Sequence, residues 1–165
     1  MVVVVDAQAA EEKSRLVLVS FTTLSMRLME NWRQLISDVS GQMPDYEKTM
    51  ILGAIITIGA EKLTRTELEP HFQSLADRFP VDRLTKCNVA SVAAAVGLNS
   101  ETVRRKIREL IDMKLVVKEP DGSLQIAPNI LELRAVRDTL QAQLELLRRI
   151  SNQLIKLHSL RIVRK

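Results

Sequence analysis

Cysteine, aromatic residues and turn-forming residues are all scarce in this chain of 165 residues. The single cysteine, Cys87, excludes an intrachain disulfide framework and fits a reducing compartment. Aromatic residues make up 3% of the sequence, and glycine and proline number five each, which disfavours an all-β sandwich or barrel. The hydrophobic fraction of 46% is nevertheless sufficient for a packed core. Because good helix formers dominate, we expect a mostly helical protein.

Long apolar runs are also missing. No segment reaches about 18 consecutive apolar residues, so we expect no membrane span and no membrane partner. The N-terminal run is only four valines, Val2–Val5, without a basic region before it, which does not fit a secretory signal. The cytoplasm is therefore the expected location. The net charge of +4 is compatible with nucleic acid as a partner, although many soluble proteins are equally basic.

The N-terminal part of the chain has the apolar spacing of helices. Apolar residues recur three or four apart over residues 11–39, which predicts one long amphipathic helix. Its stripe consists of Val17, Phe21, Leu24, Leu28, Trp32, Leu35 and Val39. After Gly41 and Pro44, Asp45 is placed to cap a second helix over residues 46–62. The middle of that helix is apolar on nearly every side, so we expect it to be buried.

A shorter helix is expected within residues 64–79, and two starting points remain open. Thr64 and Glu67 have the spacing of a capping box, but Pro70 would then lie inside the helix. A start at Glu69 would instead make Pro70 the first helical residue, a position that proline tolerates.

The stretch "VGLNSETVRRKIREL", residues 96–110, contains the most informative pattern. Asn88 can cap a helix over residues 89–96, and Gly97 follows at a position suited to a left-handed C-cap. Leu98 can then turn inward, and Asn99 or Ser100 can cap the next helix. Two helices joined by a short glycine turn are typical of a helix-turn-helix.

The second of these helices separates apolar from charged residues. On a helical wheel Val103, Ile107, Leu110 and Lys114 lie on one side, with Ile111 beside them, and all but Lys114 are apolar. The opposite side carries Glu101, Arg104, Arg105 and Arg108. Arginines can bind phosphates or guanine, and a carboxylate can accept from cytosine N4, so this face suits the major groove. An ordinary solvated helix remains an alternative, because Glu101 and Arg105 are spaced as a stabilising ion pair.

A β-hairpin is expected next, since "LVV" and "LQI" flank the turn sequence "EPDGS". Lys118 lies at its edge. Together, residues 88–117 resemble the winged helix-turn-helix of bacterial transcriptional regulators, closest to the Crp/Fnr and GntR type. The matching residues are Val92, Ala93, Val96, Gly97, Leu98, Glu101, Thr102, Val103, Arg105, Ile107, Leu110, Leu115 and Val116. The resemblance covers about 40 residues with the hairpin, which would be the wing.

The resemblance implies base or phosphate contacts by Glu101 and Arg105, and phosphate binding by Thr102. Ser100 stands where the pattern usually has arginine, which leaves the base preference open, and Lys114 replaces a glycine before the wing. Arg104 and Arg108 add positive charge. The predicted DNA-binding residues are Asn99, Ser100, Glu101, Thr102, Arg104, Arg105, Arg108 and Lys118.

A last long helix is predicted from residue 130 almost to the C-terminus. Its stripe consists of Leu133, Val136, Leu140, Leu144, Leu147, Ile150, Leu154, Leu157 and Leu160. In layout alone, the chain resembles MarR-type repressors, whose terminal helices form a dimer interface. The predicted organisation is an N-terminal extension over 1–44, a DNA-binding winged helix over 45–128, and a C-terminal helix over 129–165. Both extensions would dimerise, and the alternative is a helical hairpin within a monomer.

Enzymatic chemistry is poorly supported, and no cofactor or metal is expected. His71, Cys87 and His158 are too scattered for a recognisable metal site. Cys87 lies beside the expected helix start at Asn88, so it is either a redox sensor with a lowered thiol pKa or a small buried residue. A small-molecule effector could bind between the terminal helices and the central domain, but no residue identifies one.

These patterns predict a homodimeric, sequence-specific DNA-binding transcriptional regulator whose helix over residues 100–113 enters the major groove of double-stranded DNA. The alternative is a winged-helix module that binds another protein without reading DNA, because a fold does not determine its function.

Overall fold

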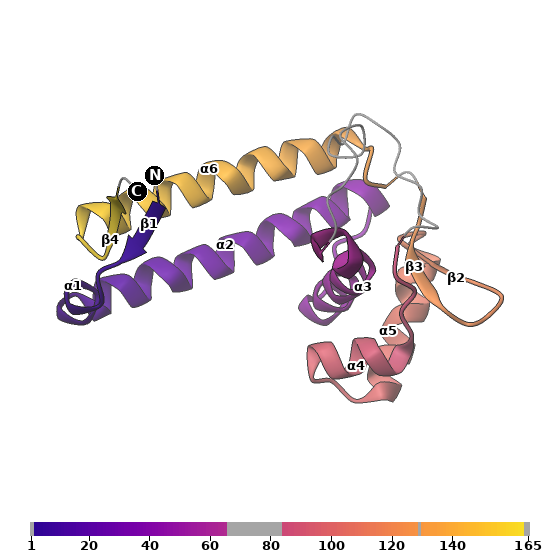
Figure 1. Cartoon of the computed structure of the whole chain (residues 1–165). Helices are drawn as coiled ribbons and strands as arrows, with labels where there is room; N and C mark the ends of the chain where they lie inside the picture. Colours follow the sequence, from indigo (N-terminus) through magenta and orange to yellow (C-terminus); the bar gives the residue numbers. More distant parts are fainter. Residues whose placement is uncertain (1, 66–83, 129, 164–165) are drawn as a thin grey trace. The chain divides into compact units, whose positions relative to one another are not determined.

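The computed structural model describes residues 2–65, 84–128 and 130–163. Most of these residues are helical, as the composition predicts, and two small antiparallel sheets of two strands each complete the fold (Figure 1). The helices are α1 (Ala7–Glu12), α2 (Ser14–Ser40), α3 (Tyr46–Arg65), α4 (Val89–Val96), α5 (Ser100–Asp112) and α6 (Arg134–Lys156). The strands are β1 (Val2–Val5), β2 (Val116–Lys118), β3 (Leu124–Ile126) and β4 (Leu160–Val163).

The chain forms two compact units. One contains residues 1–31 and 139–165, and the other contains Trp32–Asp138. The divisions fall inside α2 and α6, so they differ from the boundaries after residues 44 and 128 that the sequence predicts. Because α2 and α6 continue through these boundaries, no turn residues indicate the boundaries in the sequence.

In the first unit, the N-terminal part of α2 lies beside α6 (Figure 1). Leu146, Ile150 and Leu154 of α6 are buried at this seam. Val17, Leu24 and Leu28 of α2 and Leu160 pack against them. The stripe predicted for residues 11–39 is thus partly confirmed. The helix itself is divided at Lys13, whose Nζ donates to the carbonyl oxygen of Leu157 at 2.9 Å.

A sheet formed by β1 and β4 joins the two ends of the chain in this unit. Val2 pairs with Val163 and Val5 with Leu160. The predicted continuation of the last helix through Leu160 is wrong: α6 ends at Lys156, and His158 has a φ of +61°. The positive φ turns the chain out of the helix, and the β-branched residues that follow extend along the valines of β1.

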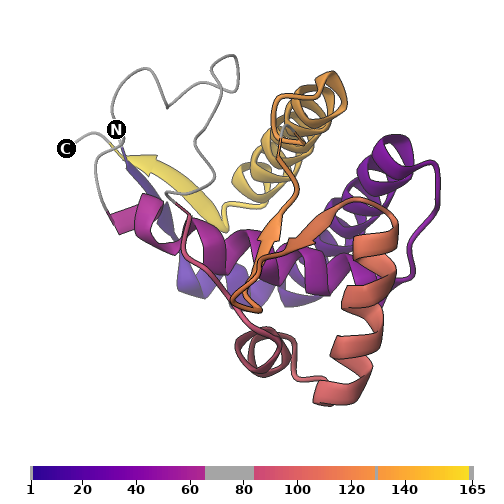
Figure 2. The ribbon, with the colours of Figure 1, turned by 90° about the vertical axis from the view of Figure 1, so that its right-hand side faces the viewer.

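The core of the second unit surrounds α3, which contacts α4, α5 and β3 (Figure 2). Asp45 caps α3 as predicted, because its Oδ1 accepts from the backbone N–H of Lys48 at 2.8 Å. Ile51 and Ile55 of α3 are buried, whereas Met50 and Thr57 are exposed, so the predicted burial of this helix is confirmed only in part. The other buried residues of this core are Ile36, Leu52, Cys87, Val92, Ala93, Val103, Ile107, Leu110, Met113, Leu115, Val116 and Leu124.

Thr64 lies within α3, so it does not begin the shorter helix expected after residue 63. The alternative start at Glu69 and Pro70, and His71, lie outside the described residues. Within the described part of the chain, no helix is both long and apolar enough to cross a membrane.

Candidate nucleic-acid interface

The turn between α4 and α5 has the predicted geometry. Asn88 forms a reciprocal capping box with Ser91 at the start of α4. Gly97 ends α4 with a φ of +68°, and its N–H donates to the carbonyl oxygen of Ala93 at 2.9 Å. Asn99, rather than Ser100, caps α5, because the Asn99 side chain accepts from the N–H of Glu101 at 2.7 Å. This cap fixes where α5 begins and therefore which residues occupy its first turn.

One face of α5 is buried against the core of the second unit. Val103, Ile107 and Leu110 are at most 3% exposed, as the helical wheel predicts. The predicted place of Lys114 on the inward side of this helix is wrong, because α5 ends at Asp112. Lys114 is exposed and has a φ of +59°. A left-handed residue at this point explains why the resembling pattern has glycine there.

Lys106 is a buried charged residue of α5 that the sequence did not single out. It is only 7% exposed although it lies in the basic segment of α5. Its Nζ forms an ion pair with Asp45, the cap of α3, and lies 3.5 Å from Oε2 of Glu47. Burial acts to raise the pKa of Asp45, but the hydrogen bonds from Lys106 and from the Lys48 N–H outweigh it, and the pKa is lowered. Lys106 therefore connects α5 to the start of α3.

A second ion pair connects α3 to the exposed face of α5. Lys48 Nζ lies 2.9 Å from Oε2 of Glu109. The other oxygen of this carboxylate, Oε1, lies 3.1 Å from Nη1 of Arg105. The hydrogen bond with Lys48 lowers the pKa of Glu109, and the same bond raises the pKa of Lys48. The ionised carboxylate of Glu109 therefore pairs with the largely buried Lys48 and with the exposed Arg105.

The outward face of α5 carries the other predicted charges. The side chains of Arg104, Arg105 and Arg108 are all more than half exposed. Glu101 Oε2 accepts from Arg104 at 2.8 Å, and its Oε1 lies 3.6 Å from Arg108. The expected pairing of Glu101 with Arg105 is therefore wrong. Glu101 instead bonds Arg104 at i,i+3 spacing, and Arg105 forms its i,i+4 ion pair with Glu109.

The β2–β3 hairpin has the predicted strands and turn. Val116 pairs with Ile126 and Lys118 with Leu124. Gly122 supplies the turn with a φ of +84°, which favours glycine. Asp121 accepts from Ser123 and from Lys86 Nζ at 2.8 Å, and the hydrogen bond from Lys86 lowers its pKa well below the usual range. These bonds brace the turn against the strand-like segment before α4.

An open hollow separates α5 from the hairpin. It is lined by the apolar residues Val89, Ile107, Ile111 and Leu124 and by the cationic residues Arg104, Arg108 and Lys118. Of the eight predicted DNA-binding residues, Asn99, Ser100, Glu101, Thr102, Arg104, Arg105 and Arg108 lie in or at the start of α5. Lys118 faces the same hollow from β2. The structure thus brings Arg104, Arg108 and Lys118 to one concave surface.

Cys87 is buried, and its Sγ donates to the carbonyl oxygen of Leu124 at 3.4 Å. Burial raises the pKa of this thiol. A redox sensor needs an accessible thiol with a lowered pKa, so the structure contradicts that interpretation and supports the packing one.

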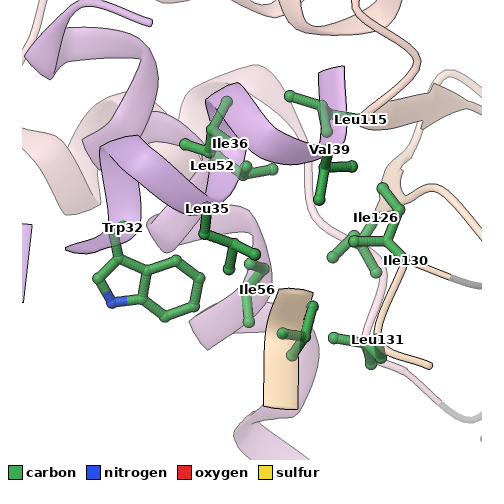
Figure 3. A pocket seen from close by; sticks show the side chains of 11 residues that line it. Trp32, Leu35, Ile36, Val39, Leu52, Ile56, Leu115, Ile126, Ile130 and Leu131 are labelled. Carbon is green, nitrogen blue, oxygen red and sulfur yellow. The ribbon is translucent and has the colours of Figure 1, made fainter. Parts of the chain in front are cut away.

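A small apolar cavity lies elsewhere in the second unit (Figure 3). It is lined by Trp32, Leu35, Ile36, Val39, Leu52, Ile56, Leu115, Ile126, Ile130, Leu131 and Val136. Its volume of about 50 Å³ is far below the roughly 300–1,000 Å³ of typical ligand pockets. This cavity therefore does not provide a site for the small-molecule effector that the sequence leaves open. Among the described residues, no cluster of His, Cys, Asp or Glu could hold a metal ion.

Comparisons of the chain with known protein families, characterised proteins and solved structures gave no match.

Proposed function

We propose that this protein is a sequence-specific DNA-binding transcriptional regulator with a winged helix-turn-helix, acting as a homodimer. The observation that carries the proposal is the exposed arginine face of α5, opposite its buried face. A capped glycine turn precedes this helix and a hairpin with an exposed lysine follows it. A helix held rigidly by one face and cationic on the other suits docking into the major groove.

The exposed residues divide into two roles. Arg105 lies in the first half of α5, where a guanidinium can form two hydrogen bonds with guanine O6 and N7. The hydroxyl groups of Ser100 and Thr102, with the Asn99 amide, lie at the helix start and bind phosphates. Arg104 and Arg108 face the hollow together with Lys118, where they bind the backbone next to the groove.

Glu101 restrains the arginines in the free protein. It bonds Arg104 and lies near Arg108, so part of the positive charge is neutralised until DNA is bound. A carboxylate on this face also opposes indiscriminate phosphate binding, and it can accept from cytosine N4 at a suitable site. Glu101 therefore favours particular sequences over DNA in general.

The homodimer is supported by apolar surface on the first unit. Between Arg15 and Arg27 of α2 there is no charged residue on any side of the helix. The exposed apolar residues of this stretch are Leu16, Leu18, Val19, Phe21 and Met26, and those of α6 are Leu140, Leu144 and Leu147. An uncharged helical surface with several exposed apolar side chains is normally covered, and a second copy would cover it through the same surface. Two reading helices would then meet half-sites about 34 Å apart.

Selection of bound sequences from a random pool of duplexes at physiological salt tests this proposal. We expect enrichment of an inverted repeat, and an affinity that falls steeply with salt because phosphate binding releases counterions. Equal affinity for selected and random duplexes, without a salt dependence, would contradict DNA reading. That outcome would favour the alternative in which the arginine face binds an acidic protein surface.

A further inference from the structure

Glu109 has two cationic partners of different kinds. Lys48 approaches one carboxylate oxygen from α3, at 2.9 Å, and its side chain is only 17% exposed. Arg105 approaches the other oxygen along α5, at 3.1 Å, and its side chain is 57% exposed. The first contact lies between two packed helices, whereas the second lies on the surface, where an ion pair is easily exchanged.

The guanidinium of Arg105 bonds Glu109 through Nη1, and this bond restrains its orientation along α5. Where a base lies out of reach of that orientation, the guanidinium must leave the carboxylate, and Glu109 is then a negative charge on the face that meets phosphates. Lys48 stays beside Glu109 after Arg105 has left, because α3 positions it through the capped turn at Asp45. The same lysine lies 3.6 Å from Asp45, which in turn is bonded by Lys106.

We propose that Lys48 is a positioning residue: by retaining Glu109, it releases Arg105 for base contact without touching DNA itself. Without Lys48, Arg105 is the remaining strong partner of Glu109 and is retained by it, so base contact competes with a tighter ion pair. The inference rests on the proposed function. It means that α3, through Lys48, contributes to the DNA sequence specificity of α5. The network also explains why an acidic residue is tolerated near a DNA-binding face.

The test is a double-mutant cycle read out as a specificity ratio. Affinities of the full chain for a selected duplex and a scrambled duplex are measured for wild type, Lys48→Met, Glu109→Gln and the double variant. We expect Lys48→Met to lower the ratio of the two affinities by about three- to fivefold, the size of a surface ion pair. In the Glu109→Gln background the same substitution should leave the ratio unchanged, because Lys48 acts through that carboxylate.

Three matched proteins keep the outcome interpretable. Lys156→Met removes the same charge from α6 and should change both affinities equally, whereas Lys48→Arg should keep the wild-type ratio. Glu109→Gln alone changes a side chain that is 35% exposed, and its ratio should not fall below that of wild type, which tests the idea even if Lys48→Met folds poorly. An equal loss from Lys48→Met in both backgrounds, or on both duplexes, would overturn the inference and leave DNA reading intact. A wild-type ratio of one would instead overturn the proposed function as well.

Discussion

Gly97 lies in the left-handed region, and the direction of α5 depends on it. No atom lies within 4 Å of where a Cβ would be built, so a substitution there meets open space. The cost of Gly97→Ala is therefore conformational, and we expect the free energy of unfolding to fall by about 1–2 kcal/mol. Gly97→Asn should cost less, because asparagine tolerates this conformation better. Urea denaturation measures both variants, and equal losses from alanine and asparagine would contradict this explanation.

Lys106 gives a second prediction at the scale of one residue. Lys106→Met keeps most of the buried aliphatic volume but removes the cation beside Asp45. We expect a loss of about 1–3 kcal/mol in the free energy of unfolding, because the carboxylate loses a charged partner. The side chain of Asp45 is 44% exposed and can be hydrated, which keeps the loss below that of a fully buried pair. Lys114→Met, at an exposed position, is the control and should have little effect in the same denaturation experiment.

The lowered pKa values of Asp45 and Glu109 predict how stability depends on pH. A carboxylate whose pKa is lower in the folded protein adds stability above its ordinary pKa, and this contribution is lost as the pH falls through the folded value. The ordinary values are 3.8 for Asp45 and 4.5 for Glu109. The free energy of unfolding should thus decline on acidification from about pH 4.5, and less steeply in Glu109→Gln. Denaturation at a series of pH values checks this, and an unchanged slope in the variant would contradict it.

At the scale of elements, α5 and the hairpin should contribute differently to DNA binding. Arg105→Ala should cost about 1–3 kcal/mol of binding free energy and relax specificity at one base position. Lys118→Ala, on the hairpin, should weaken binding to all sequences alike and lower the salt slope by about one. Titrations of selected and scrambled duplexes at several salt concentrations separate the two effects. A base-specific effect from Lys118→Ala would show that the hairpin reads sequence as well.

The elements also differ in how far the sequence predicts them. Asn88, Gly97 and Gly122 carry local signals, so the start and end of α4 and the β2–β3 turn agree with prediction. The burial of Lys106 has no local signal, because its partner Asp45 lies 61 residues away in sequence. A lysine in a basic helix is normally a solvated charge, and only the packing of α5 on the start of α3 makes it a buried one.

At the scale of the whole molecule, the exposed apolar surface of α2 and α6 predicts a dimer. Phe21 and Leu144 are 51% and 56% exposed, so Phe21→Glu and Leu144→Glu should leave each chain folded. Burying a carboxylate in an apolar interface is costly, and we expect the dimer dissociation constant to rise by about tenfold or more. Sedimentation equilibrium measures it, with Gln141→Glu as a polar control that introduces the same charge.

A wild-type chain that sediments as a monomer would contradict the dimer. The packing of α2 against α6 would then occur within one chain, as a helical hairpin in a monomer. Phe21 shows why the sequence left the choice between a dimer and a monomeric helical hairpin open. It belongs to the predicted inward stripe of α2, but the structure places Val17, Leu24 and Leu28 at the seam and leaves Phe21 half-exposed.

The sequence alone determined α3, α4 and α5, the caps at Asp45, Asn88 and Gly97, and the hairpin, because these depend on the spacing of neighbouring residues and on turn chemistry. It also determined which face of α5 carries the arginines. Only the tertiary structure decided which apolar stripe is buried, where the units divide, and which charge pairs with which. The β1–β4 sheet and the contacts of Lys48 and Lys106 join residues far apart in sequence. Such contacts arise from packing, which leaves no periodic signal along the chain.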